Sequence, residues 1–229
     1  MGYTRKVMEF LAIFFIELLV LFFASQMLTR SLSMLFFRIT KSQTVTIQLL
    51  SILFLPGVIV HELAHLLTAS ILFVPVGEIE FFPKITDHGV KLGSVAIGKT
   101  DPVRRALIGF APVFVGLIIL FGVMFYVATP LGVSANGTVT FLIAAYVAFE
   151  IGNTMFSSKK DLEGTIELLL VFVFFAVLLY FLGVRIDTAF VKQILSEDLI
   201  TFIKKAIFFL SLPITIDLGV WGATKLLRL

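Results

Sequence analysis

The chain contains no cysteine, a single tryptophan and few charged side chains. Without cysteine, the protein has no disulfides, no cysteine-ligated metal and no thiol nucleophile. Charged residues make up 14% of its 229 residues, whereas soluble domains average about 25%. A soluble protein of this size would lack the polar surface needed to cover itself. The scarcity of charge therefore argues against a soluble domain.

The abundant residue types indicate a membrane protein. Hydrophobic residues make up 59% of the chain, 26 residues are phenylalanine, and the mean hydropathy is +1.08. The formal net charge of +3 is small and is spread over the predicted loops, which gives no nucleic-acid footprint but suits contact with anionic lipid headgroups. We therefore expect an integral membrane protein in the lipid bilayer, with no nucleic-acid partner.

Apolar runs long enough to cross a bilayer recur along the chain. Six are predicted, at residues 7–28, 46–74, 104–128, 138–158, 163–184 and 201–224. Two segments between them, 29–45 and 185–198, have the pattern of helices that lie on the membrane surface. The predicted fold class is an all-α membrane protein, a polytopic bundle of about six transmembrane helices in one domain covering residues 1–229.

Residues 77–98 differ from the rest of the chain. Apolar and polar residues alternate over residues 78–81 and 90–92, and Thr86-Asp87-His88-Gly89 has the composition of a turn. This pattern predicts a β-hairpin or small sheet after the second helix. An exposed edge of such a sheet can pair with an extended peptide. Alternatively, the segment is a loop that caps the membrane face.

The second predicted span carries the motif His61-Glu62-Leu63-Ala64-His65. Positions i and i+4 lie on the same face of a helix, so both imidazoles can reach one metal ion, and Glu62 stands at the edge of that face. These residues are costly within a membrane unless they share a partner, and a zinc ion suits two imidazoles. The alternatives are a polar contact between helices or a proton path.

A catalytic zinc site requires a third protein ligand and leaves the fourth position open. Composition alone does not choose among the candidates. These are Glu17, Asp87, His88, Glu150, Asp161 and Asp217.

Several features together resemble the site-2 protease family of intramembrane zinc metalloproteases. An HExxH motif on an early helix is followed by a strand-rich segment and by Gly109-x-x-Pro112. The family also carries Asn-x-x-Pro-x-x-x-x-Asp-Gly, and the spacing from Asn153 to Asp161 matches it. Here Phe156 replaces the proline and Leu162 replaces the glycine. The resemblance covers approximately residues 46–165.

The resemblance implies a role for each matching residue. His61, His65 and Asp161 would bind one zinc ion per chain, and Glu62 would be the catalytic base. Asn153 would lie near the substrate, and the strand-rich segment would hold an unwound segment of a membrane-spanning protein. Two alternatives stay open: an ion or proton transporter that uses the His-Glu-His cluster, and an inactive, protease-like scaffold.

The loop charges predict the orientation of the bundle. The loops on the side of the N-terminus hold more lysine and arginine than those on the other side, which favours both termini in the cytoplasm. The HExxH motif then lies about 14 Å from the cytoplasmic end of its helix, at 1.5 Å per residue. We expect a multi-pass protein of the cell membrane that cleaves its substrate near the cytoplasmic side.

Overall fold

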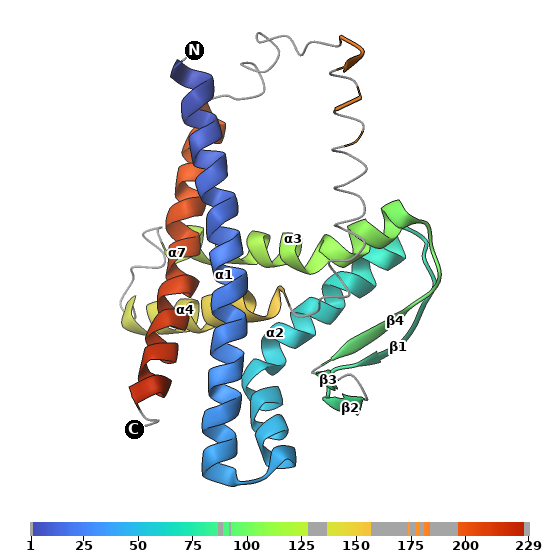
Figure 1. Ribbon diagram of the computed structural model, residues 1–229, viewed down its shortest axis with the longest axis vertical. Coiled ribbons are helices and arrows are strands. Elements are labelled where there is room, and N and C mark those ends of the chain that lie inside the picture. Colours follow the sequence, from blue (N-terminus) through green and yellow to red (C-terminus); the bar gives the residue numbers. More distant parts are fainter. Residues whose placement is uncertain are drawn as a thin grey trace.

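The computed structural model describes residues 2–86, 89–91, 93–127, 137–156 and 197–226, together with positions 174, 177–178 and 181–183. Its long helices are α1 (Gly2–Thr40), α2 (Gln43–Ile71), α3 (Pro102–Val127), α4 (Gly137–Thr154) and α7 (Glu197–Leu226). Its strands are β1 (Val76–Glu80), β2 (Lys84–Thr86), β3 (Gly89–Lys91) and β4 (Ser94–Ile97). Figure 1 shows α1 and α7 side by side along the long axis, with the strands beside α2.

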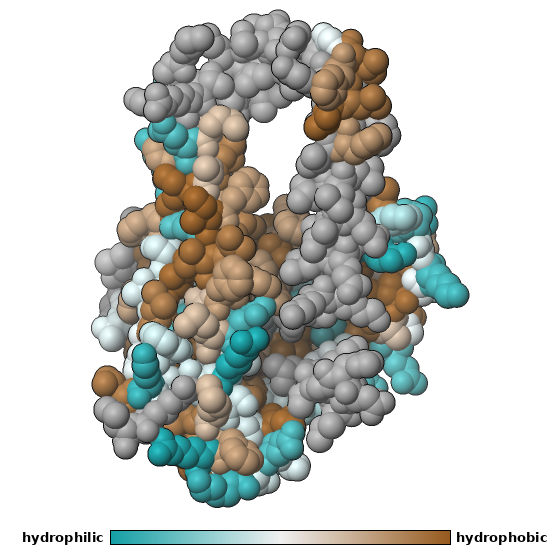
Figure 2. Space-filling view, in the orientation of Figure 1, coloured by the Kyte–Doolittle hydropathy of each residue, from teal (hydrophilic) through white to brown (hydrophobic). Residues whose placement is uncertain are grey.

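Four of the described helices are long and apolar enough to cross a membrane. They cover Val7–Thr40, Gln43–Ile71, Pro102–Val127 and Ile200–Leu226. Figure 2 shows apolar surface along α1 and α7, and hydrophilic surface gathered at the lower end, around the turn from α1 to α2. The predicted span 138–158 corresponds to α4, which is not one of the four. The predicted segments 163–184 and 185–198 lie almost wholly outside the described residues, so the number of six spans stays a prediction.

Helix α1 is continuous, which corrects the predicted division between a span ending at residue 28 and a surface segment at 29–45. No glycine or proline stands between Gly2 and Pro56 to break a helix. In addition, Leu28 and Leu32 are buried in one cluster with Phe54 of α2. The chain turns only at Lys41, which has a positive φ of 53°, and at Ser42, whose hydroxyl accepts the Val45 N–H and caps α2.

The strands confirm the predicted strand-rich segment after the second helix. β1 pairs antiparallel with β4, and β2 pairs antiparallel with β3. Since the β2–β3 pair lies between β1 and β4 in the sequence, the segment is one long hairpin in two parts. Pro83 precedes β2 and has no N–H to donate to a ladder, which suits its place at the break between the two parts.

Helix α4 packs closely on its neighbours through glycines. A Cβ added to Gly57 of α2 would lie 2.8 Å from the Glu150 carbonyl oxygen of α4. One added to Gly116 of α3 would lie 2.9 Å from Met155 Cβ, and one added to Gly152 of α4 itself would lie 2.9 Å from Pro213 Cβ of α7. Small residues allow helices in a membrane to approach in this way. The close crossings fix α2 and α3 relative to α4.

Helix α3 begins with a cap just outside the apolar part of the chain. The Asp101 carboxylate accepts the Arg104 backbone N–H at 3.0 Å and lies 3.3 Å from Arg104 Nε. The hydrogen bond from the Arg104 N–H, together with the charge of the Arg104 side chain, lowers the pKa of Asp101. A charged carboxylate at this end also suits the helix dipole.

Candidate functional site

The HExxH motif lies in the half of α2 that follows Pro56, a proline inside the helix. Figure 1 shows that α2 changes direction along its length. Proline has no N–H to donate and disturbs the hydrogen bonds around it. The N–H of the next residue, Gly57, donates to Glu150 Oε2 at 3.2 Å. This bond ties the beginning of the motif-bearing half of α2 to α4.

The structure brings the two motif histidines together in the interior. His61 and His65 are each 4% exposed. Their Nε2 atoms are 3.1 Å apart, and their rings are nearly perpendicular, at 83°. The spacing of i and i+4 on α2 produces this arrangement directly.

A backbone carbonyl of α3 orients the second histidine. His65 Nδ1 lies 2.8 Å from the Ile108 carbonyl oxygen, and this contact is buried. A carbonyl oxygen only accepts hydrogen bonds, so we assign the proton of a neutral His65 to Nδ1. Its Nε2 then carries the lone pair and faces His61. A ligating histidine typically donates its other ring N–H to a carbonyl or carboxylate in this way.

The donor pair fits a zinc ion. Two nitrogens that each bind one zinc ion at 2.0–2.1 Å in a tetrahedral arrangement lie about 3.3 Å apart, close to the 3.1 Å between the two Nε2 atoms. A direct hydrogen bond between the rings would also account for the distance, with the proton on His61 Nε2. Within the described ranges, no third histidine, aspartate or glutamate joins the pair to form a group of three.

Glu62 is buried beside the histidines and lies against the strand segment. Its side chain is 6% exposed. Gly93 lies between β3 and β4, and a Cβ added there would stand 3.0 Å from Glu62 Oε1 and 2.6 Å from Val58 Cγ1. Only a residue without a side chain fits so close to both. The strand segment therefore contacts α2 at the level of the motif.

This contact places the hairpin alongside α2 rather than at its end. Val58 and Glu62 lie 13 and 9 residues before Ile71, where α2 ends, which corresponds to about 14–20 Å along the helix axis. Figure 1 shows β1 and β4 running back beside α2 from the α3 end of the hairpin. The segment is therefore a paired hairpin that lies against α2, and its two predicted roles, pairing with a peptide and capping the membrane face, both stay predictions.

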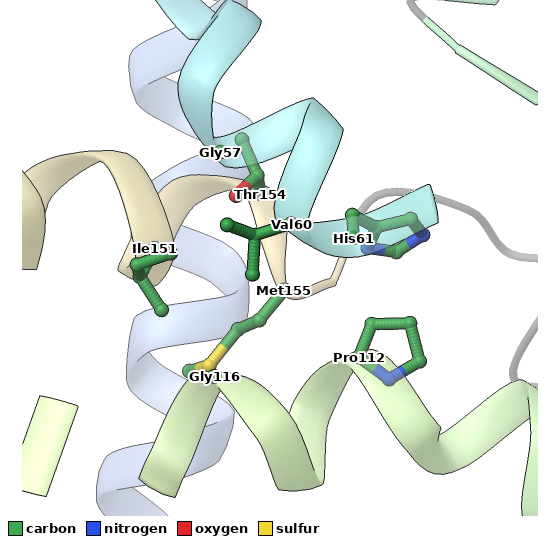
Figure 3. Close-up of a pocket in the computed structure, with 8 residues that line it drawn as sticks. All are labelled: Gly57, Val60, His61, Pro112, Gly116, Ile151, Thr154 and Met155. Atoms are coloured by element: carbon green, nitrogen blue, oxygen red, sulfur yellow. The ribbon is translucent and has the colours of Figure 1, made fainter. Parts of the chain in front are cut away.

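A small pocket, with no room for a water molecule, borders His61. Figure 3 shows the Pro112 ring of α3 opposite the His61 ring of α2. The residues that line the pocket come from α2, α3, α4 and the turn that follows α4. They are Gly57, Val60, His61, Pro112, Gly116, Ile151, Thr154 and Met155. Most of this lining is apolar, so the pocket gives His61 a largely apolar wall on the side of α3 and α4.

The structure gives Asn153 a partner within the protein. Its amide nitrogen donates to the Phe149 carbonyl at 2.9 Å and to Asp217 Oδ1 of α7 at 2.7 Å. Asp217 is 1% exposed. The predicted contact between Asn153 and a substrate stays a prediction, and the described partners of its amide are the Phe149 carbonyl and Asp217.

The predicted third ligands fall into two groups. Asp87, His88 and Asp161 lie outside the described residues, so the assignment of Asp161 to the metal stays a prediction. Glu17, Glu150 and Asp217 are described, and none of them forms a group of three with the two histidines. Glu150 instead bonds to Gly57, and Asp217 bonds to Asn153. Of the described candidates, none is therefore placed as the third ligand.

The chain was compared with family models, curated proteins and solved structures. None of the three comparisons found a match.

Three contacts of the site were not anticipated from the sequence. They are the Ile108 carbonyl on His65, the Glu150 carboxylate on Gly57 N–H, and the Asp217 carboxylate on Asn153. Only the first contact is indicated by a nearby residue in the sequence. A proline at position 112 removes the helical donor for the carbonyl at position 108, four residues earlier. The other two contacts join residues that are separated by 93 and by 64 positions in the sequence. No periodic pattern in the sequence predicts contacts between residues so far apart.

Proposed function

We propose that the protein is an intramembrane zinc metalloprotease that hydrolyses a peptide bond of a membrane-spanning substrate near the cytoplasmic side. In this proposal it is a multi-pass protein of the cell membrane with about six spans and both termini in the cytoplasm. His61, His65 and Asp161 bind one zinc ion, and Glu62 is the base. The observation that carries the proposal is the pair of buried Nε2 atoms, 3.1 Å apart, with His65 held by the Ile108 carbonyl.

The position of Glu62 supports its role. Glu62 shares the motif with the two ligands and is buried beside them. His61 and His65 would hold a zinc ion that supplies Lewis-acid chemistry and makes water a nucleophile near neutral pH. The Glu62 carboxylate would take the proton from the attacking water and pass it to the departing amine. This role needs a basic group next to the metal ligands that is not itself a ligand, and Glu62 meets that description.

The strand segment supports a peptide as the substrate. A peptide bond within a helix is shielded by its own hydrogen bonds, so a membrane-spanning substrate must unwind before it is cleaved. An extended peptide recovers backbone hydrogen bonds by pairing with the edge of a sheet. Gly93 brings the hairpin against Glu62, so a peptide paired with the hairpin edge would lie near the proposed base.

Substitution of Glu62 tests the proposed mechanism. The purified protein is reconstituted in liposomes with single-span peptides that carry glycine near the end of the membrane helix, and products are read by mass spectrometry. We expect Glu62→Gln to bind zinc normally and to cleave about 100-fold more slowly or worse, because the water loses its base. The matched control is Glu197→Gln, at an exposed glutamate at the beginning of α7, away from the motif and the strands, which should cleave like the wild type.

Two outcomes of this experiment would count against the proposal. Cleavage by Glu62→Gln at the wild-type rate would show that the proposed base is wrong. A wild-type protein that binds zinc fully but cleaves none of the peptides would favour the inactive, protease-like scaffold.

Buried carboxyl groups favour a second candidate function, an ion or proton transporter. Glu150 and Asp217 are 2% and 1% exposed. Among the described residues, Glu150 Oε1 and Asp217 Oδ2 have no hydrogen-bond partner. Ionisable groups within membrane helices often mark proton paths. A pH-sensitive dye inside the same liposomes distinguishes the two functions, because a transporter acidifies or alkalises the lumen and a protease leaves the lumen pH unchanged.

A further inference from the structure

Pro112 leaves one backbone carbonyl of α3, that of Ile108, without its usual donor within the helix. In an α-helix the N–H of residue i donates to the carbonyl of residue i−4. Pro112 has no N–H, so the carbonyl of Ile108 loses its helical donor. Ile108 is 2% exposed and lies within a helix apolar enough to cross a membrane. Such a carbonyl needs a donor from a neighbouring helix.

His65 supplies that donor. Its Nδ1 lies 2.8 Å from the Ile108 oxygen. The contact fixes two properties of the imidazole at once: which nitrogen carries the proton, and which way the ring faces. With Nδ1 held by α3, Nε2 points at His61 Nε2, 3.1 Å away.

We propose that Pro112 is a positioning residue for His65, because its missing N–H reserves the Ile108 carbonyl for the imidazole. The inference rests on the proposed zinc site and adds to it a residue that binds neither the metal nor the substrate. Pro112 also lines the pocket beside His61, opposite the imidazole ring (Figure 3). One short stretch of α3 therefore borders both proposed ligands.

The substitution Pro112→Ala restores an N–H at position 112, which then competes with His65 for the Ile108 carbonyl. We expect zinc to bind about 10- to 100-fold more weakly, the range typical for the loss of a partner that orients a metal ligand. The melting temperature of the metal-free protein should not fall, because alanine favours a helix interior far more than proline does. Zinc affinity is measured by competition with a chromophoric chelator in detergent micelles.

The matched control is Pro213→Ala, at a proline inside α7 that packs against Gly152. It removes the same kind of residue from a helix that gives no described contact to either histidine. We expect its zinc affinity to match that of the wild type. If Pro112→Ala matches the zinc affinity of Pro213→Ala, Pro112 acts through packing alone and the proposal is wrong.

The proton position on His65 gives a readout that does not depend on zinc or activity. The chain has three histidines, so ¹⁵N-labelled histidine in the metal-free protein gives few signals, and His65→Gln identifies the one from His65. We expect the wild-type His65 to carry its proton on Nδ1, and Pro112→Ala to show a mixture of both forms. A wild-type His65 protonated on Nε2 would overturn the proposal even if the variant failed to fold.

The two proposals fail in different ways. If the wild type shows the Nδ1–H form but binds no zinc, the zinc protease is wrong and the role of Pro112 in orienting His65 stands. If the wild type binds zinc and Pro112→Ala changes neither its affinity nor the proton position, the zinc site stands and the role of Pro112 is wrong.

Discussion

The three helices around the motif and the pair formed by α1 and α7 are joined to their neighbours by different kinds of contact. Hydroxyl groups bond within their own helix in both regions, as Ser25 of α1 does to the Phe22 carbonyl and Thr154 of α4 does to the Glu150 carbonyl. Around the motif, polar groups also bond between helices, from His65 to α3 and from Gly57 to α4. A bond within one helix survives when the helix shifts, whereas a bond between helices fixes their relative position.

This difference indicates where the molecule needs accurate geometry. A metal site must hold its ligands to a fraction of an ångström, and supporting hydrogen bonds provide that accuracy. The contacts of α1 and α7 around Leu21, Leu28 and Leu210 are apolar, and such packing tolerates volume-conserving changes. We therefore expect substitutions around the motif to disturb function more than comparable substitutions in α7.

Among the substitutions that test this difference, Gly57→Ala is expected to cause the largest loss of stability. The new Cβ would collide with Thr154 and lie 2.8 Å from the Glu150 carbonyl oxygen, so α2 and α4 must move apart. We expect a loss of about 1–3 kcal/mol of stability, with weaker zinc binding because Gly57 stands one turn before His61. Thermal unfolding and zinc titration in micelles measure the two effects.

Gly219→Ala in α7 is the control for this substitution. A Cβ added there meets nothing within 4 Å, so the variant should be as stable as the wild type or slightly more stable. Equal stability of the two alanine variants would contradict the close crossing of α2 and α4, and with it the distinction between the two regions.

A smaller effect is expected at the Asn153–Asp217 bond, which joins the two regions. Asn153→Ala and Asp217→Ala each remove one side of a buried hydrogen bond, whereas Asp217→Asn keeps an acceptor for the Asn153 amide. A double-mutant cycle on thermal stability should give a coupling of about 1 kcal/mol or less, as is usual for hydrogen bonds between membrane helices.

Peptide cleavage by the same variants tests whether Asn153 contacts the substrate or only bonds to Asp217. If Asn153 serves mainly to bond Asp217, both alanine variants should lower the cleavage rate alike. If Asn153 contacts the substrate, as the family resemblance implies, Asn153→Ala alone should lower kcat/KM strongly while Asp217→Ala has little effect. Additive losses of stability would show that the two side chains do not interact.

The sequence predicts the parts of this structure that depend on local pattern. Hydropathy locates the apolar helices, the alternation in residues 77–98 locates the strands, and the i, i+4 spacing brings His61 to His65. The predicted division of α1 at residue 28 is wrong, because the charges of Arg30 and Arg38 suit a surface segment but do not break a helix. Burial of Leu32 against α2 shows that the helix continues through this stretch.

Pairs between distant helices could not be predicted, for a physical reason. Asp217 lies 64 residues from Asn153, and Glu150 lies 93 residues from Gly57. Such contacts depend on how whole helices pack, which in turn depends on close crossings at single glycines. The Ile108 carbonyl is an intermediate case. Pro112 predicts that this carbonyl lacks a helical donor, but it does not predict that the donor is His65.

The central claim is that His61 and His65 bind one zinc ion, and the zinc content of the purified protein tests it most directly. Wild type, His65→Ala and His88→Ala are reconstituted, dialysed against a weak chelator and analysed by mass spectrometry for metals. We predict one zinc ion per chain in the wild type and in His88→Ala, and essentially none in His65→Ala. A wild type without zinc, or a His65→Ala variant that keeps as much zinc as the wild type, would contradict the claim.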